Sequence, residues 1–128
     1  MIVDAPKVKA EVEAAFARYE AALVSNDVAT LNELFHDDPR TLRYGIAENL
    51  HGHAEISGFR AARPPVGLAR TIERTLITTW GNDFASACTL FRRPTLPGKI
   101  GRQSQTWVRT PAGWKIVAAH VSIIDTPA

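Results

Sequence analysis

The fold of this chain is decided by a stretch near its C-terminus, GRQSQTWVRTPAGWKIVAAHVSII (residues 101–124). Two runs of alternating side chains, residues 101–110 and 114–124, lie on either side of the short loop TPAG. Alternation with a period of two is typical of strands that bury one face, and a short loop with Pro and Gly joins antiparallel strands. The stretch therefore predicts a β-hairpin.

Two further strands are predicted before this hairpin. Residues 70–80 alternate and are rich in Thr and Ile, and residues 84–92 follow after the turn sequence GND. A short strand is also predicted over residues 41–46, and residues 45–52 are predicted to be mostly loop. The second half of the chain thus predicts a long antiparallel meander.

The first half predicts helices. Apolar side chains recur at helical spacing after Asp4, a plausible N-cap, as far as the sequence SND at residues 25–27. A short second helix follows and ends before Pro39, and a third is predicted over residues 54–63. Helices followed by a meander indicate an α+β fold, in which the helices cover one face of a strongly curved, mostly antiparallel sheet that encloses a pocket.

Composition excludes several classes of protein. The 128 residues predict a single domain over residues 1–128, long enough to bury a core without disulfides. The net charge is only +2 and no basic run is present, so nucleic-acid binding is not expected. No apolar stretch is long enough to cross a membrane and no signal peptide is visible, so a cytoplasmic location is expected. Cys88, the single cysteine, excludes an intramolecular disulfide.

Pairing across the TPAG loop predicts which side chains of the hairpin share a face. In register, Trp107 lies opposite Ile116 and Gln103 lies opposite His120. One face then carries Gln103, Gln105, Trp107, Ile116, Ala118, His120 and Ser122. This face is aromatic near the loop and polar at its far end, which is typical of a ligand pocket with an apolar floor. It is also compatible with contact to a partner subunit, and a slip of one residue would exchange the two faces.

Three residues are candidates for chemistry. Arg43 is a charge at the centre of a short strand, and a buried guanidinium requires an anion, either a substrate carboxylate or a salt bridge to Glu48 or Asp37. The alternative is a solvent-facing position at the edge of the sheet. Tyr19 lies on the apolar side of the first helix, and its hydroxyl would bond a ligand or a backbone carbonyl. His120 suits proton transfer near neutral pH, or a hydrogen bond within a polar core.

The remaining polar residues carry weaker signals. No nucleotide-binding or EF-hand motif is present, and His51 and His53 make a poor metal site, so we expect neither a metal nor a cofactor. Five arginines are scattered over the strands and loops of the second half and are expected on a solvated or subunit-contacting face; they are Arg70, Arg74, Arg92, Arg93 and Arg109.

Two longer stretches resemble a known family. LRYGIAENLHGHAEISGFRAAR and FRRP…GRQSQTWVRTPAGWKIVAAHVS are similar to the AtzH-like family, which includes the HpxZ proteins of oxalurate catabolism. That family belongs to the NTF2-like (cystatin-like, SnoaL-like) superfamily, whose α+β cone fold the resemblance implies here. Its proposed functional pair, a tyrosine on the first helix and an arginine on the first strand, matches Tyr19 and Arg43.

The resemblance implies a function in nitrogen-compound catabolism. The implied activity is that of a cofactor-free enzyme on a small anionic ureido or amide acid such as 1,3-dicarboxyurea or oxalurate, by hydrolysis or decarboxylation. The alternative is a non-catalytic ligand-binding or accessory module that works with a partner amidase. A homo-oligomer, a dimer or tetramer, is expected in either case. The candidate catalytic residues are Tyr19 and Arg43, and the candidate substrate-binding residues are His120, Ser122, Gln105, Trp107, Tyr44 and Glu48.

Overall fold

Helix α1 (Pro6–Val24) forms because apolar side chains recur along one side of it. Val12, Phe16 and Tyr19 from this stripe are buried against the sheet. Asp4 was predicted as the N-cap of this helix, and that prediction is wrong. Its backbone is left-handed (φ 55°), and its Oδ1 accepts a hydrogen bond from the backbone N–H of Thr79 at 2.9 Å, so it ties the N-terminus to the sheet.

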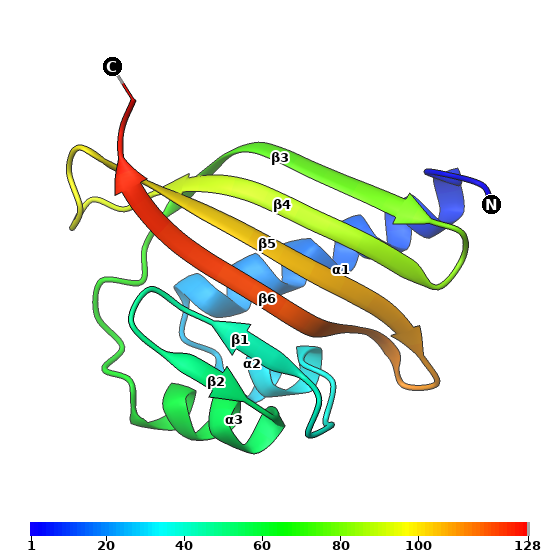
Figure 1. Ribbon diagram of the computed structural model, residues 1–128, viewed down its shortest axis with the longest axis horizontal. Coiled ribbons are helices and arrows are strands. Elements are labelled where there is room, and N and C mark those ends of the chain that lie inside the picture. The colour runs from blue at the N-terminus through cyan, green and yellow to red at the C-terminus, as the bar shows by residue number, and fades with distance from the viewer. Residues whose placement is uncertain (128) are drawn as a thin grey trace.

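The computed structural model describes residues 1–127. After α1 the elements are α2 (Val28–Leu34), β1 (Leu42–Tyr44), β2 (Asn49–His51), α3 (His53–Ala62), β3 (Thr71–Trp80), β4 (Phe84–Arg92), β5 (Lys99–Thr110) and β6 (Gly113–Asp125). The six strands form one sheet in the order β2-β1-β6-β5-β4-β3, in which only β1 and β6 run parallel. Figure 1 shows α1 crossing one face of the sheet, with α2 and α3 beside β1 and β2.

The predicted α+β fold, with helices packed on a curved, mostly antiparallel sheet, is confirmed. The core lies between the helices and the inner face of the sheet, where Leu31, Trp107 and Ile116 are fully buried. One local prediction differs, because β2 forms in a segment that was predicted to be mostly loop. Within residues 1–127, no helix is both long and apolar enough to span a membrane.

The hairpin of β5 and β6 differs from the predicted register at one point. Arg109 pairs with Trp114 and Trp107 pairs with Ile116, as predicted. Thr106 then pairs with Ala118, so that Val117 is an extra residue in β6 and forms a β-bulge. Because successive side chains of a strand point to opposite faces, every residue of β6 beyond the bulge changes face relative to the prediction.

Candidate functional site

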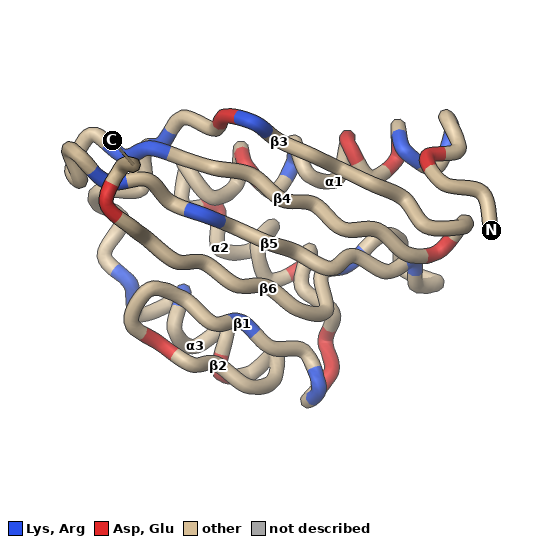
Figure 2. Tube along the Cα trace, turned by 45° about the horizontal axis from the view of Figure 1, so that its top comes forward, with Lys and Arg blue, Asp and Glu red and all other residues tan. Residues whose placement is uncertain are grey.

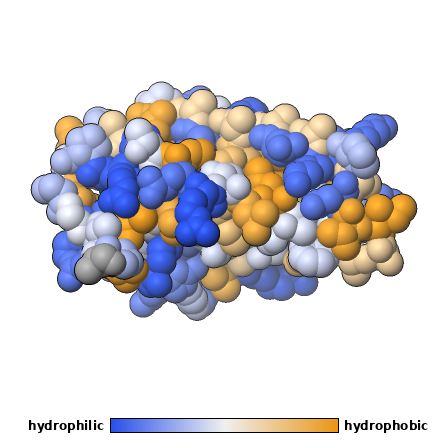
Figure 3. All heavy atoms as spheres, turned by 90° about the horizontal axis from the view of Figure 1, so that it is seen from above, coloured by the Kyte–Doolittle hydropathy of each residue, from blue (hydrophilic) through white to orange (hydrophobic). Residues whose placement is uncertain are grey.

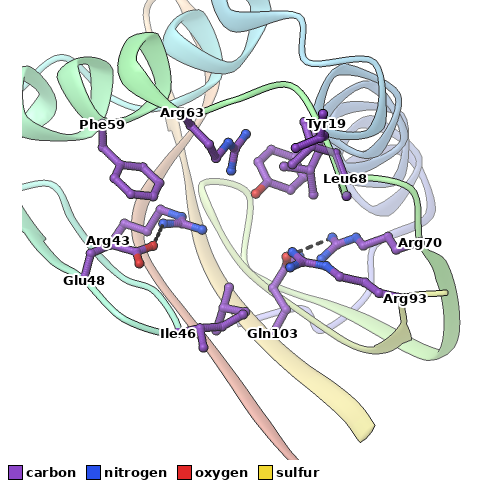
Figure 4. A pocket seen from close by; sticks show the side chains of 14 residues that line it. Tyr19, Arg43, Ile46, Glu48, Phe59, Arg63, Leu68, Arg70, Arg93 and Gln103 are labelled. Carbon is purple, nitrogen blue, oxygen red and sulfur yellow. Dashed lines mark hydrogen bonds and ion pairs between the residues drawn. The ribbon is translucent and has the colours of Figure 1, made fainter. Parts of the chain in front are cut away.

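A cavity of about 200 Å³ opens between α1, the β1–β2 hairpin, α3 and the inner face of β5 and β6. Figure 4 shows charged side chains converging on it from several elements. The residues that line it are Tyr19, Leu23, Arg43, Ile46, Glu48, Phe59, Arg63, Val66, Gly67, Leu68, Arg70, Arg93, Gln103 and Val121. Its volume suits a small molecule, and much of its lining is basic.

Arg43 lies on the inner face of β1 and is only 7% exposed. Its Nη1 donates a hydrogen bond of 2.7 Å to Oε1 of Glu48, which forms the salt bridge that the sequence allowed. Gly45 leaves room for this ion pair, because a Cβ atom there would lie 1.7 Å from that carboxylate oxygen and would displace the Glu48 side chain. The Arg43 Nε is buried without a hydrogen-bond partner in the described chain.

Arg70 is held on the opposite side of the cavity. Its guanidinium donates two hydrogen bonds to the carboxylate of Glu20, one of them from Nε at 3.2 Å. It also lies 4.5 Å from the centre of the Phe91 ring and donates to Oε1 of Gln103 at 2.9 Å. The side chain of Arg70 is 1% exposed, so the expectation of a solvated or subunit-contacting position for this residue is wrong.

Three more arginines lie near Tyr19 without a carboxylate partner among residues 1–127, and two of them, Arg63 and Arg93, line the cavity. Arg60, on α3, is 1% exposed and all three of its guanidinium nitrogens are without hydrogen bonds. Arg63 lies at the end of α3, and Arg93 follows β4; each has at least one buried nitrogen without a partner. Burial lowers the pKa of Arg60, and burial together with the neighbouring arginines lowers the pKa of Arg63 and of Arg93. Arg93 was expected on a solvated face, which the structure contradicts.

Tyr19 lies in the middle of these charges. The residue is 2% exposed, and Figure 4 shows its hydroxyl directed into the space near Arg43 and Arg63. Burial by itself would raise the pKa of the Tyr19 phenol, but the positive charges of Arg60, Arg43 and Arg70 outweigh burial and hold this pKa below its ordinary value.

The site therefore has an excess of positive charge. Five guanidinium groups surround Tyr19, whereas within residues 1–127 only Glu20 and Glu48 supply carboxylates to them. Buried cations without partners are costly, and a bound anion would satisfy them. The arrangement can hold a small acid with its carboxylate against guanidinium groups and its reacting atoms beside a phenol.

The structure brings some of the predicted site residues together. Tyr19, Arg43 and Glu48 all line the cavity. Gln105 and Trp107 are on the inner face of β5, as predicted, but they do not line it. Trp107 donates from Nε1 to Oε1 of Gln105 at 3.0 Å, and both are buried in the core.

Three predicted substrate-binding residues lie on the outer face of the sheet, so their predicted position is wrong. The β-bulge at Val117 turns His120 and Ser122 away from the cavity. His120 is exposed, and the Ser122 hydroxyl accepts a hydrogen bond from Arg102 Nε at 3.2 Å. Tyr44 follows Arg43 directly on β1, so it points to the opposite face, where its ring lies 6.3 Å from that of His120.

Sequence reasoning missed most of the cationic lining. Arg60 lies on α3, where it is buried like Ile56, and Arg63 is the residue directly after the helix, with its guanidinium 5.9 Å from the centre of the Phe59 ring. An arginine on the apolar side of a helix was the available signal. Arg70 and Arg93 carried no comparable signal, because they lie just outside β3 and β4.

Among residues 1–127 no group of three or more His, Cys, Asp or Glu side chains is placed to hold a metal.

Comparisons with known proteins agree with this architecture. A family model described as AtzH-like matches residues 1–127. A crystal structure of a protein of unknown function from the DUF3225 family of Pectobacterium atrosepticum is 56% identical, with a TM-score of 0.93 over 96% of this chain and 95% of that one. A cystatin-like fold protein from Burkholderia xenovorans is 50% identical, with a TM-score of 0.95 over 99% of both chains.

More distant structures share the fold alone. An NTF2-like protein of unknown function from Pseudomonas putida is 15% identical and has a TM-score of 0.76 over 91% of this chain and 86% of that one. No protein with a curated function matches the chain.

Proposed function

The chain belongs to the AtzH-like family of NTF2-like proteins, and on this premise we propose that it is a cofactor-free enzyme of nitrogen-compound catabolism. Its proposed substrate is a small anionic ureido or amide acid, of the kind that 1,3-dicarboxyurea and oxalurate represent. The observation that carries the proposal is the buried Tyr19 phenol among five guanidinium groups, three of which have no carboxylate partner in the described chain.

The substrate carboxylate is the natural partner of these cations. A guanidinium binds a carboxylate through two parallel hydrogen bonds, and burial strengthens the attraction. Arg43 retains a buried Nε without a partner beside its bond to Glu48, and Arg63 lines the same cavity. The cavity volume of about 200 Å³ favours a substrate of a few carbon, nitrogen and oxygen atoms.

Decarboxylation fits the arrangement better than hydrolysis. In the loss of carbon dioxide from an N-carboxylate, the N–C bond breaks, its electron pair stays on nitrogen and spreads into the ureido carbonyl, and a proton joins the nitrogen. The guanidinium groups would stabilise that negative charge, and Tyr19 would supply the proton.

Hydrolysis would instead require a base that activates water. Glu48 is the one carboxylate among the residues that line the cavity, and its two oxygens already accept hydrogen bonds from Arg43 and from the Ala47 N–H. His120, the other base considered, lies on the outer face. The same lack of a free base supports the second candidate, a module that binds the acid for a partner amidase without converting it.

Turnover by the purified protein tests the proposal. We expect carbon dioxide release from 1,3-dicarboxyurea, a loss of about a hundredfold in Tyr19→Phe, the size typical of general acid catalysis, and a large loss in Arg43→Lys. Tyr44→Phe and Arg40→Lys are matched controls, because Tyr44 is on the outer face and Arg40 pairs with Asp38 at the surface.

The two functions give different results in this experiment. Wild-type protein that releases neither carbon dioxide nor ammonia, yet binds the acid tightly and loses binding in Arg43→Ala, is a binding module. Full activity in both Tyr19→Phe and Arg43→Lys would show that the reaction takes place elsewhere.

A further inference from the structure

Gln103 is the uncharged polar side chain that the sheet contributes to the cavity. It lies on the inner face of β5, is 2% exposed and belongs to the cavity lining. Figure 4 shows it rising from the strand toward Arg70. Its Oε1 accepts a hydrogen bond of 2.9 Å from Arg70 Nη2.

The orientation of the Gln103 amide follows from that bond. A guanidinium has donors only, so the carbonyl oxygen of the amide must face Arg70 and the NH₂ group must face away from it. Arg70 is itself held by two hydrogen bonds to Glu20 and by the Phe91 ring. The direction of the Gln103 Nε2 is therefore determined by a chain of contacts that begins on α1.

The Nε2 of Gln103 is buried and has no acceptor within residues 1–127. The other polar side chains of the cavity are four arginines, which can only donate hydrogen bonds, together with Glu48 and Tyr19. The Glu48 oxygens already accept from Arg43 and from the Ala47 N–H, and Tyr19 makes no hydrogen bond with Gln103. A buried donor without a partner is destabilising, so a ligand that brings an acceptor oxygen to this position gains affinity.

We infer that Gln103 is a specificity-determining residue whose Nε2 donates a hydrogen bond to the uncharged carbonyl oxygen of the ligand. The inference rests on the proposed function and deepens it, because it adds a requirement for a ureido or amide carbonyl to the requirement for a carboxylate. Guanidinium groups already serve the carboxylates, and a neutral amide donor matches the neutral oxygen between the charged ends.

Two dicarboxylates of equal length test this inference. 3-Oxoglutarate carries a central carbonyl and glutarate does not, while their charges are the same. By isothermal titration calorimetry we expect wild-type protein to bind 3-oxoglutarate about fivefold more tightly, the size of one hydrogen bond. In Gln103→Met the ratio of the two affinities should fall to about one, with glutarate affinity unchanged.

Gln105→Met is the matched control. Gln105 lies on the same face of β5, is also 2% exposed and also has a buried Nε2 without a partner, but it does not line the cavity. This variant should keep the wild-type ratio. Gln103→Glu preserves an acceptor for Arg70 and removes the donor, so its ratio should be one or lower, although its added negative charge weakens the binding of both acids. This variant serves if Gln103→Met does not fold.

The outcomes separate the two proposals. Equal binding of the two acids by wild-type protein, or a wild-type ratio in Gln103→Met or Gln103→Glu, overturns the role of Gln103 alone. A matching loss of affinity for both acids in Gln103→Met also overturns it, since Gln103 would then act by holding Arg70. Failure of wild-type protein to bind either acid contradicts the proposed anion site itself.

Discussion

Tyr19 shows how one side chain acquires its properties from residues far away in the sequence. Its place on the apolar side of α1 follows from helical periodicity, and burial of a phenol would ordinarily keep it protonated. Arg43 from β1, Arg60 from α3 and Arg70 from the segment just before β3 reverse that effect and lower its pKa. A residue that looks like core in the sequence thus has a phenol whose pKa lies below its ordinary value.

The lowered pKa predicts how anion binding changes with pH. When the Tyr19 phenol ionises, the cavity gains a negative charge, so affinity for an anion such as glutarate falls as the pH rises through this pKa. Because the pKa lies below the ordinary tyrosine value of about 10, the fall begins at a lower pH than an exposed tyrosine would give. Calorimetry across the alkaline range checks this in wild type, Tyr19→Phe and Tyr44→Phe. Tyr19→Phe should lose the fall and Tyr44→Phe should keep it; the same fall in all three proteins contradicts the assignment.

Strand β6 shows how one extra residue decides which side chains reach the cavity. The bulge at Val117 leaves Ile116 on the inner face and brings Ala119 and Val121 there in place of the predicted His120 and Ser122. The exchange leaves the imidazole of His120 exposed on the outer face and gives the cavity an apolar wall. Alternation in a sequence predicts which side chains share a face of the sheet only where the strand register is continuous.

His120 and Ser122 should therefore be dispensable for ligand binding. We expect His120→Ala and Ser122→Ala to bind glutarate as wild-type protein does, because both side chains lie on the outer face. Arg43→Ala, from the inner face of β1, is the positive control and should lose most of the affinity. A loss in His120→Ala comparable to that in Arg43→Ala would mean that the strand adopts the register without the bulge.

The whole molecule has two unlike ends. The net charge is only +2, and Figure 2 shows Lys and Arg residues at both ends of the molecule, several of them near the C-terminus. Figure 3 shows hydrophobic atoms gathered at the other end, where the chain begins. Val3 bridges to Trp80 there, and Trp80 pairs with Phe84; we call Ile2, Val3, Trp80 and Phe84 the N-terminal patch.

The N-terminal patch predicts how the expected homo-oligomer forms. Trp80 is 42% exposed and Phe84 46% exposed on the outer face of the sheet, which the helices leave uncovered. Burying large aromatic side chains between two copies would remove apolar area from water. Light scattering should show an oligomer for wild type and a monomer for Trp80→Lys or Phe84→Lys. Val24→Lys, with the same 42% exposure at the end of α1, should leave the assembly intact. An unchanged mass in both patch variants would contradict this interface.

The sequence by itself determined the parts of this protein that depend on neighbouring residues. The periodicity of residues 8–23, the loop at residues 110–113 and the alternation of β3 to β6 are local signals, and they were enough for the α+β fold and for the placement of Tyr19. The short strand predicted over residues 41–46 placed Arg43 in the same way. Resemblance to the AtzH-like family added the choice of those two residues as a pair.

Only the tertiary structure decided what surrounds that pair. Arg60, Arg70 and Arg93 come from three separate segments, and no local pattern reports that they meet around one phenol. The bulge at Val117 likewise depends on how two strands pair and pack together, and the sequence of either strand alone does not predict it. The physical reason is the same in both cases: secondary structure follows from short-range periodicity, whereas charge convergence and strand register are settled by contacts between residues distant in the chain.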